Sequence, residues 1–112
     1  MTAVDIVQRQ LDAYNARDLE GFVATYSETI QICRLPSCEP LISSKRELAE
    51  LYASRVFNAP SLHAEILDRM VLGNKVIDHE RVSGLREVPF EAVAVYEVAE
   101  GLIQRVWFLN PD

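Results

Sequence analysis

The sequence predicts an α+β fold with N-terminal helices packed on one face of a curved antiparallel sheet. Apolar residues recur at helical spacing between residues 3 and 57. From residue 63 onward, four runs rich in β-branched and aromatic residues follow one another, some separated by tight-turn dipeptides. Helices followed by a meander of strands are typical of this class. At 112 residues, the chain is expected to form one domain over residues 1–112.

The first predicted helix covers residues 3–16. Thr2 and Asp5 form a capping-box pattern at its start. Its apolar stripe contains Val4, Val7, Leu11 and Tyr14. Asp18 is typical of the N-cap of a short second helix, which is expected over residues 19–26.

A third helix is predicted over residues 45–57, because Ser44 and Glu47 form a second capping-box pattern. The expected inward stripe of this helix contains Leu48, Leu51, Tyr52 and Val56. Between the second and third helices, the alternation of Ile30, Gln31 and Ile32 predicts a short strand. The two prolines of residues 35–40 predict a loop after that strand.

Four further strands are predicted at residues 63–72, 75–83, 90–98 and 102–109. Gly73-Asn74 suits a two-residue type II′ turn with glycine at its first central position. Glu100-Gly101 suits a second tight turn.

Composition excludes several classes of partner. The formal net charge is −6, from 11 basic and 17 acidic residues, which argues against nucleic acid or an anionic membrane as a partner. No apolar run approaches the 18 residues of a membrane span, and the N-terminus lacks the apolar core of a signal peptide. A cytoplasmic location is therefore expected.

Three segments, "LDAYNARDLEGFVATYSE", "SSKRELAELYASRVF" and "VYEVAEGLIQRVWF", resemble the nuclear transport factor 2-like superfamily, in particular its SnoaL-like and ketosteroid-isomerase-like branches. The resemblance covers nearly the whole chain. It implies a cone-shaped α+β barrel with an apolar pocket between the helices and the concave sheet, and commonly a homodimer through the sheet. The family contains isomerases, cyclases, dehydratases and binding domains, so the fold does not decide the function.

Isomerases of this fold pair an aspartate base with an oxyanion hole made of a tyrosine and a protonated aspartate. By resemblance, Tyr14 occupies the position of the tyrosine. The position of the base falls on Arg34, which does not accept a proton near neutral pH. The second aspartate falls on Ala94. These departures argue against ketosteroid isomerase chemistry by that mechanism.

A two-residue turn at 73–74 fixes the cross-strand pairs of the hairpin, and successive pairs alternate between the two sheet faces. One face is predicted to carry the pairs Met70–Ile77, Asp68–His79 and Ile66–Arg81. The other is predicted to carry Arg69–Asp78, Leu67–Glu80 and Glu65–Val82. The face with Asp68 has the more apolar neighbours, so we expect it to line the cone.

An inward Asp68–His79 pair predicts a general base, because the carboxylate would orient the imidazole and raise its proton affinity. In this hypothesis His79 and Asp68 are catalytic, and Tyr14 donates a hydrogen bond to a substrate oxygen. The alternative is a polar pair at the pocket rim or a dimer interface, since cross-strand charged pairs commonly stabilise sheets.

Asp78 and Glu80 lie two residues apart and share a strand face, where paired carboxylates are able to act as acid and base. Arg69 opposite Asp78 favours a salt-bridge ladder instead, extended by Glu91, Glu97 and Arg105. Such a ladder among valines on the convex face suits a dimer interface.

Aromatic residues are expected in the pocket wall or the core. The predicted ligand-binding set is Tyr26, Tyr52, Phe57, Tyr96 and Phe108. The two cysteines do not match a zinc pattern, so no metal or cofactor is expected. Cys33 is expected to be a small buried residue, and Cys38 a thiol at the pocket mouth.

Two functions remain open from the sequence. The first is a cofactor-independent isomerase, cyclase or dehydratase acting on a small apolar or oxygenated molecule by proton transfer. The second is a non-catalytic domain that binds a small molecule, or that interacts as a dimer through its sheet.

Overall fold

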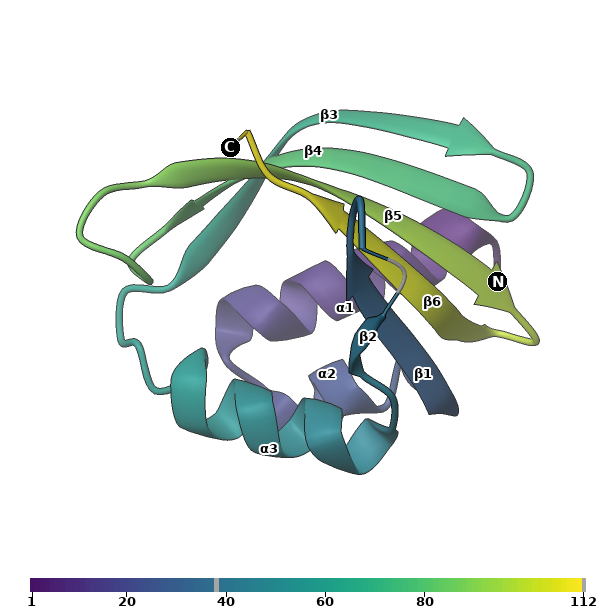
Figure 1. Ribbon diagram of the computed structural model, residues 1–112, viewed down its shortest axis with the longest axis horizontal. Helices are drawn as coiled ribbons and strands as arrows, with labels where there is room; N and C mark the ends of the chain where they lie inside the picture. Colours follow the sequence, from purple (N-terminus) through teal and green to yellow (C-terminus); the bar gives the residue numbers. More distant parts are fainter. Residues whose placement is uncertain (38, 112) are drawn as a thin grey trace.

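Three helices lie under the concave face of a strongly curved six-stranded sheet (Figure 1). The computed structural model describes residues 1–37 and 39–111. In chain order the elements are α1 (Ala3–Ala16), α2 (Leu19–Val23), β1 (Tyr26–Arg34), β2 (Pro40–Ile42), α3 (Lys45–Arg55), β3 (His63–Leu72), β4 (Lys75–Ser83), β5 (Phe90–Ala99) and β6 (Leu102–Leu109).

The predicted start of α1 is confirmed in detail. The Thr2 side chain accepts a hydrogen bond from the Asp5 amide at 3.2 Å, and the Thr2 amide donates to the Asp5 carboxylate at 2.9 Å. Asp18 caps α2 by accepting from the Gly21 amide at 3.0 Å. The reciprocal cap of α1 and the single cap of α2 satisfy amides that have no partner within a helix.

The second helix is shorter than predicted, because Tyr26 begins β1 instead of ending α2. Tyr26 pairs with Ile103 of β6, and the Ile103 amide donates to the Thr25 carbonyl at 2.8 Å. Pairing with a distant strand therefore overrides the local helical pattern. For the same reason β1 has nine residues, longer than the short strand expected.

The sheet order is β2-β1-β6-β5-β4-β3. The four C-terminal strands form the predicted antiparallel meander, and β6 also pairs in parallel with β1. The sheet is therefore mixed, and its last strand in sequence lies near its middle.

The hairpin register is confirmed near the turn and wrong beyond a β-bulge. Leu72 pairs with Lys75 and Asp68 with His79, as predicted. The register then shifts between Ile66 and Asp68, so that Ile66 pairs with Glu80. Gly73 has a φ of 60°, as its position in a type II′ turn requires.

An aromatic cluster forms the centre of the core beneath the sheet. Phe22 is fully buried, and its ring centroid lies 4.7 Å from that of Tyr52 and 5.1 Å from that of Phe57. Leu48 is fully buried as predicted, whereas Leu51 is 38% exposed, so its predicted inward position is wrong.

Cys33 is buried in β1 as predicted, and Cys38 lies outside the described residues. Among residues 1–37 and 39–111, the helices are too short or too polar to cross a membrane.

Candidate functional site

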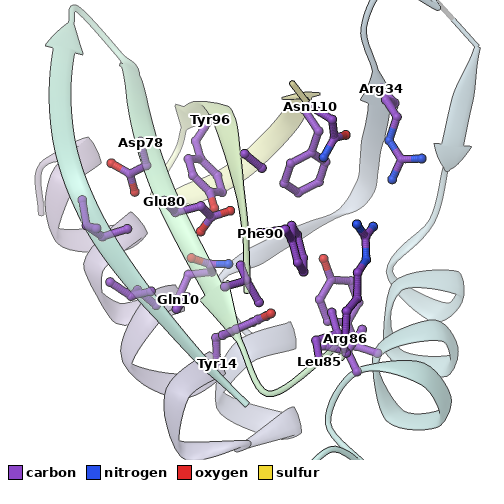
Figure 2. A pocket seen from close by; sticks show the side chains of 18 residues that line it. Gln10, Tyr14, Arg34, Asp78, Glu80, Leu85, Arg86, Phe90, Tyr96 and Asn110 are labelled. Atoms are coloured by element: carbon purple, nitrogen blue, oxygen red, sulfur yellow. The ribbon is translucent and has the colours of Figure 1, made fainter. Parts of the chain in front are cut away.

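A cavity of about 190 Å³ lies between α1, the end of α3 and the concave face of the sheet. Figure 2 shows side chains from separate elements pointing into it, among them Tyr14 of α1 and Glu80 of β4. Its walls combine apolar residues of β3 to β5 with a small number of polar groups. This combination is typical of small-molecule sites.

Two carboxylates enter the cavity wall from β4, because Asp78 and Glu80 alternate onto its inner face. Asp78 is 1% exposed and forms a two-point ion pair with Arg69 of β3. Arg69 donates from Nε to Asp78 Oδ1 at 2.7 Å and from Nη2 to Oδ2 at 3.0 Å. The predicted Arg69–Asp78 pair is thus confirmed, but it lies on the inner face and not on the convex one.

The same arginine connects the carboxylate to the first helix. Arg69 Nη1 donates to the Gln8 side-chain oxygen at 2.8 Å. Hydrogen bonding to Asp78 raises the pKa of Arg69. Asp78 is therefore held in one position beside Glu80 by two donors from β3.

Glu80 differs from Asp78 in its electrostatic environment. Burial, and to a smaller extent the negative charge of Asp78, raise the pKa of Glu80 from 4.5 to about 7. Near neutral pH this carboxyl group therefore exists in both protonation states. Such a group is able to take a proton from one atom and return it to another.

Three tyrosines line the cavity: Tyr14, Tyr52 and Tyr96. Burial raises the pKa of each of them, so each hydroxyl keeps its proton at neutral pH and is able to donate a hydrogen bond. The hydroxyl end of Tyr96 points toward the Glu80 carboxylate in Figure 2, and the charge of Glu80 contributes to raising the Tyr96 pKa.

The predicted ligand-binding set divides between cavity and core. Tyr52, Tyr96 and Phe108 are cavity-lining residues. Tyr26 is 2% exposed, and its hydroxyl accepts from the Gln10 side chain at 3.0 Å. Phe57 packs in the aromatic cluster around Phe22. Tyr26 and Phe57 are therefore core residues behind the cavity wall.

The expected inward orientation of His79 and Asp68 is wrong. The His79 side chain is 44% exposed, and its Nε2 lies 2.6 Å from the Glu91 carboxylate on the outer face. Asp68 is exposed and accepts from the Arg69 amide at 3.0 Å. The catalytic roles predicted for His79 and Asp68 required both side chains to point into the cavity, and neither does.

The bulge at Leu67 explains this error. Strict alternation would place Ile66 and Asp68 on the same sheet face. The apolar side chain of Ile66 therefore favoured the prediction that this face lines the cavity. The extra residue sends Ile66 and Arg69 to the cavity side and leaves Asp68 outside. Met70, the other apolar neighbour, is 61% exposed.

Sequence reasoning did not place Glu80, Arg86 or Asn110 in the cavity wall. The spacing of Asp78 and Glu80 on one strand face was the available signal for an acid–base site. The Arg69–Asp78 salt bridge was the alternative explanation for these carboxylates. Both features coexist on one strand. Ala94, at the position where the resemblance predicts an aspartate, is the cross-strand partner of Asp78.

Comparisons with known proteins agree with this architecture. A model of the SnoaL-like domain matches residues 7–106. An uncharacterised cystatin-fold protein from Novosphingobium aromaticivorans is 26% identical, with a TM-score of 0.87 covering 96% of this chain and 97% of that one. No curated protein matches at the threshold of significance.

Two more distant structures share the fold alone. An LEH-like epoxide hydrolase from M. tuberculosis is 18% identical, with a TM-score of 0.81 over 96% of this chain and 81% of that one. A computationally designed 17-OHP binder is 13% identical, with a TM-score of 0.82 over 96% and 91%. Together with the observed layers, these matches confirm the predicted α+β cone.

Proposed function

Because the chain belongs to the SnoaL-like domain family, we propose that it binds a small, largely apolar, oxygenated molecule in the cone cavity and moves a proton on it. The observation that carries this proposal is Glu80, a buried carboxyl group whose pKa lies near 7, in the cavity wall. An epoxide hydrolase and a designed small-molecule binder with this fold support the use of the cavity as a ligand site.

In the proposed reaction Glu80 is the acid–base residue. Its ionised form takes a proton from the substrate, and its protonated form returns one at a second atom, which gives isomerisation, cyclisation or elimination. Tyr14 or Tyr96 donates a hydrogen bond to the substrate oxygen on which negative charge develops. Tyr52 and Phe108 contact the apolar body of the ligand.

Proton transfer is measurable before the natural substrate is known. Small cyclic ketones in D₂O exchange the hydrogens next to their carbonyl group, and NMR follows this exchange. We expect the protein to accelerate the exchange with a rate that titrates near pH 7. Glu80→Gln should lower the acceleration by about 100-fold or more, since it removes the proton acceptor.

The matched control is Glu65→Gln, which changes an exposed carboxylate on β3. It should exchange like the wild type. Binding of a ketone without exchange in the wild type would favour the second candidate, a non-catalytic binding domain. Exchange that is as fast in Glu80→Gln as in the wild type would contradict the proposal.

We further propose a cytoplasmic homodimer that associates through the outer face of the sheet. Apolar side chains on that face remain partly exposed, including Met70 at 61% and Leu109 at 43%. Sedimentation at increasing concentration tests the association, and a purely monomeric species at millimolar concentration would contradict it.

A further inference from the structure

Two arginines from distant parts of the chain line the mouth of the cavity. Arg34 is the last residue of β1, and Arg86 lies in the loop between β4 and β5. Figure 2 shows their guanidinium groups on the side of the cavity opposite Asp78 and Glu80. Two arginines that line one cavity stand out in a chain whose formal net charge is −6.

Neither arginine forms an ion pair with a described residue. The ion pairs formed by residues 1–37 and 39–111 involve Lys45, Arg46, Arg69, Lys75 and His79 as their basic members. Arg69, inside the same fold, forms a two-point ion pair with Asp78, so the mouth arginines contrast with it. No described residue accepts a hydrogen bond from either guanidinium, which leaves these donors available to a ligand.

Arg86 is nevertheless held in place. Its guanidinium carbon lies 4.1 Å from the centroid of the Phe90 ring, in a cation–π stack. Stacking fixes the plane of the guanidinium and leaves its edge free to donate hydrogen bonds. Preorganisation of this kind lowers the entropy that a ligand loses on binding.

A third polar group at the mouth lacks a partner. Asn110 lines the same cavity, and its side-chain oxygen is buried without a hydrogen-bond partner among the described residues. A half-turn of the amide exchanges this oxygen for a nitrogen that donates. Buried polar atoms normally have partners, so this one is consistent with a site that a polar ligand completes.

We propose that the ligand of this cavity is a small carboxylic acid, whose carboxylate binds Arg34 and Arg86 at the mouth and whose apolar body extends toward Glu80. The position of its reactive carbon at Glu80 rests on the proposed function, whereas the binding of the carboxylate does not. A planar carboxylate matches the two-donor edge of a guanidinium.

A carboxylate is preferred over a phosphate because a dianion would be repelled more strongly by Asp78 and Glu80. The chain also lacks a glycine-rich loop of the kind that binds phosphate through backbone amides. Phosphonates therefore serve as the competing probe.

The experiment is calorimetric titration at low ionic strength with benzoate, phenylacetate and hexanoate, each compared with its neutral amide and its phosphonate analogue. We expect at least one carboxylate to bind about tenfold or more tightly than its amide and its phosphonate. Arg34→Gln and Arg86→Gln should each weaken that binding by about 10- to 100-fold, the usual cost of losing a charge-assisted pair.

The matched control is Arg81→Gln, because Arg81 is an exposed arginine on β4 next to Glu80 in sequence. It should bind the carboxylate like the wild type, and urea unfolding verifies that all variants are folded. Equal affinity for acid and amide, or equal affinity of the mouth variants and the wild type, overturns the proposal. Tighter binding of the phosphonate overturns the choice of carboxylate.

Glu80→Gln separates this inference from the proposed function. It should keep or strengthen carboxylate binding, because it removes a like charge, while it lowers the acceleration of proton exchange by about 100-fold or more. Unchanged exchange together with arginine-dependent carboxylate binding would refute the catalytic role alone. Normal exchange of ketones with no preference for carboxylates would refute the inference alone.

Discussion

Replacing Glu80 by glutamine is expected to stabilise the protein at alkaline pH and to have a much smaller effect in mild acid. Glutamine has nearly the shape of glutamate but carries no charge. In the folded protein the pKa of Glu80 is raised from 4.5 to about 7, mainly by burial. Ionisation of this side chain therefore costs more in the folded state than in the unfolded state.

The sign follows from proton linkage. Between pH 4.5 and about 7 the folded protein binds more protons at Glu80 than the unfolded chain does, so the free energy of unfolding falls as the pH rises. The full penalty, at about 1.4 kcal/mol for each pH unit between the two values, amounts to about 3 kcal/mol. By proton linkage, the raised pKa of Glu80 lowers the free energy of unfolding by about 1 kcal/mol at pH 5 and by about 3 kcal/mol at pH 8.

Urea unfolding of the wild type and of Glu80→Gln at both pH values measures the difference. Other carboxylates contribute equally to both proteins and cancel in the comparison. Glu65→Gln, on the exposed side of β3, should change the free energy of unfolding by no more than about 0.5 kcal/mol at either pH. A stability difference between wild type and Glu80→Gln that is the same at pH 5 and pH 8 would refute the reasoning.

Three other outcomes are expected. Arg69→Met leaves Asp78 buried and unpaired, so it should lower the free energy of unfolding measured in urea by about 3–5 kcal/mol. Arg46→Ala breaks an exposed ion pair and should lower it by about 0.5 kcal/mol or less. Gly84→Ala should reduce the melting temperature far more than Gly73→Ala does. Both residues have positive φ, but a β-carbon at position 84 collides with the Ser61 carbonyl, whereas one at position 73 meets no atom within 4 Å. His79→Ala should leave ketone exchange unchanged, because the side chain is on the outer face; a loss of exchange would contradict this orientation.

Local signals in the sequence were sufficient for most of the fold. The capping patterns of Thr2 and Ser44 depend on residues three positions apart, and both caps are present. The tight turn at 73–74 required only a glycine at its first position. These features are decided by neighbouring residues, which a sequence displays directly.

The site depended on information that the local pattern does not contain. One inserted residue at Leu67 exchanged the faces of β3 beyond it, and no composition rule marks such a bulge. Arg34 and Arg86 are 52 positions apart by their numbering, and only the tertiary fold brings them to one cavity. Tyr14 was identified by resemblance, and it does line the cavity.

The place of β6 in the sheet has a consequence for how the protein is made. Residues 102–109 separate β1 from β5, so the N-terminal and C-terminal strands have no shared edge until that segment has left the ribosome. A nascent chain that stops short of it holds two incomplete sheets with open hydrogen-bonding edges, which are prone to pair with other chains. Assembly of the cone is thus delayed until residues 102–109 have left the ribosome.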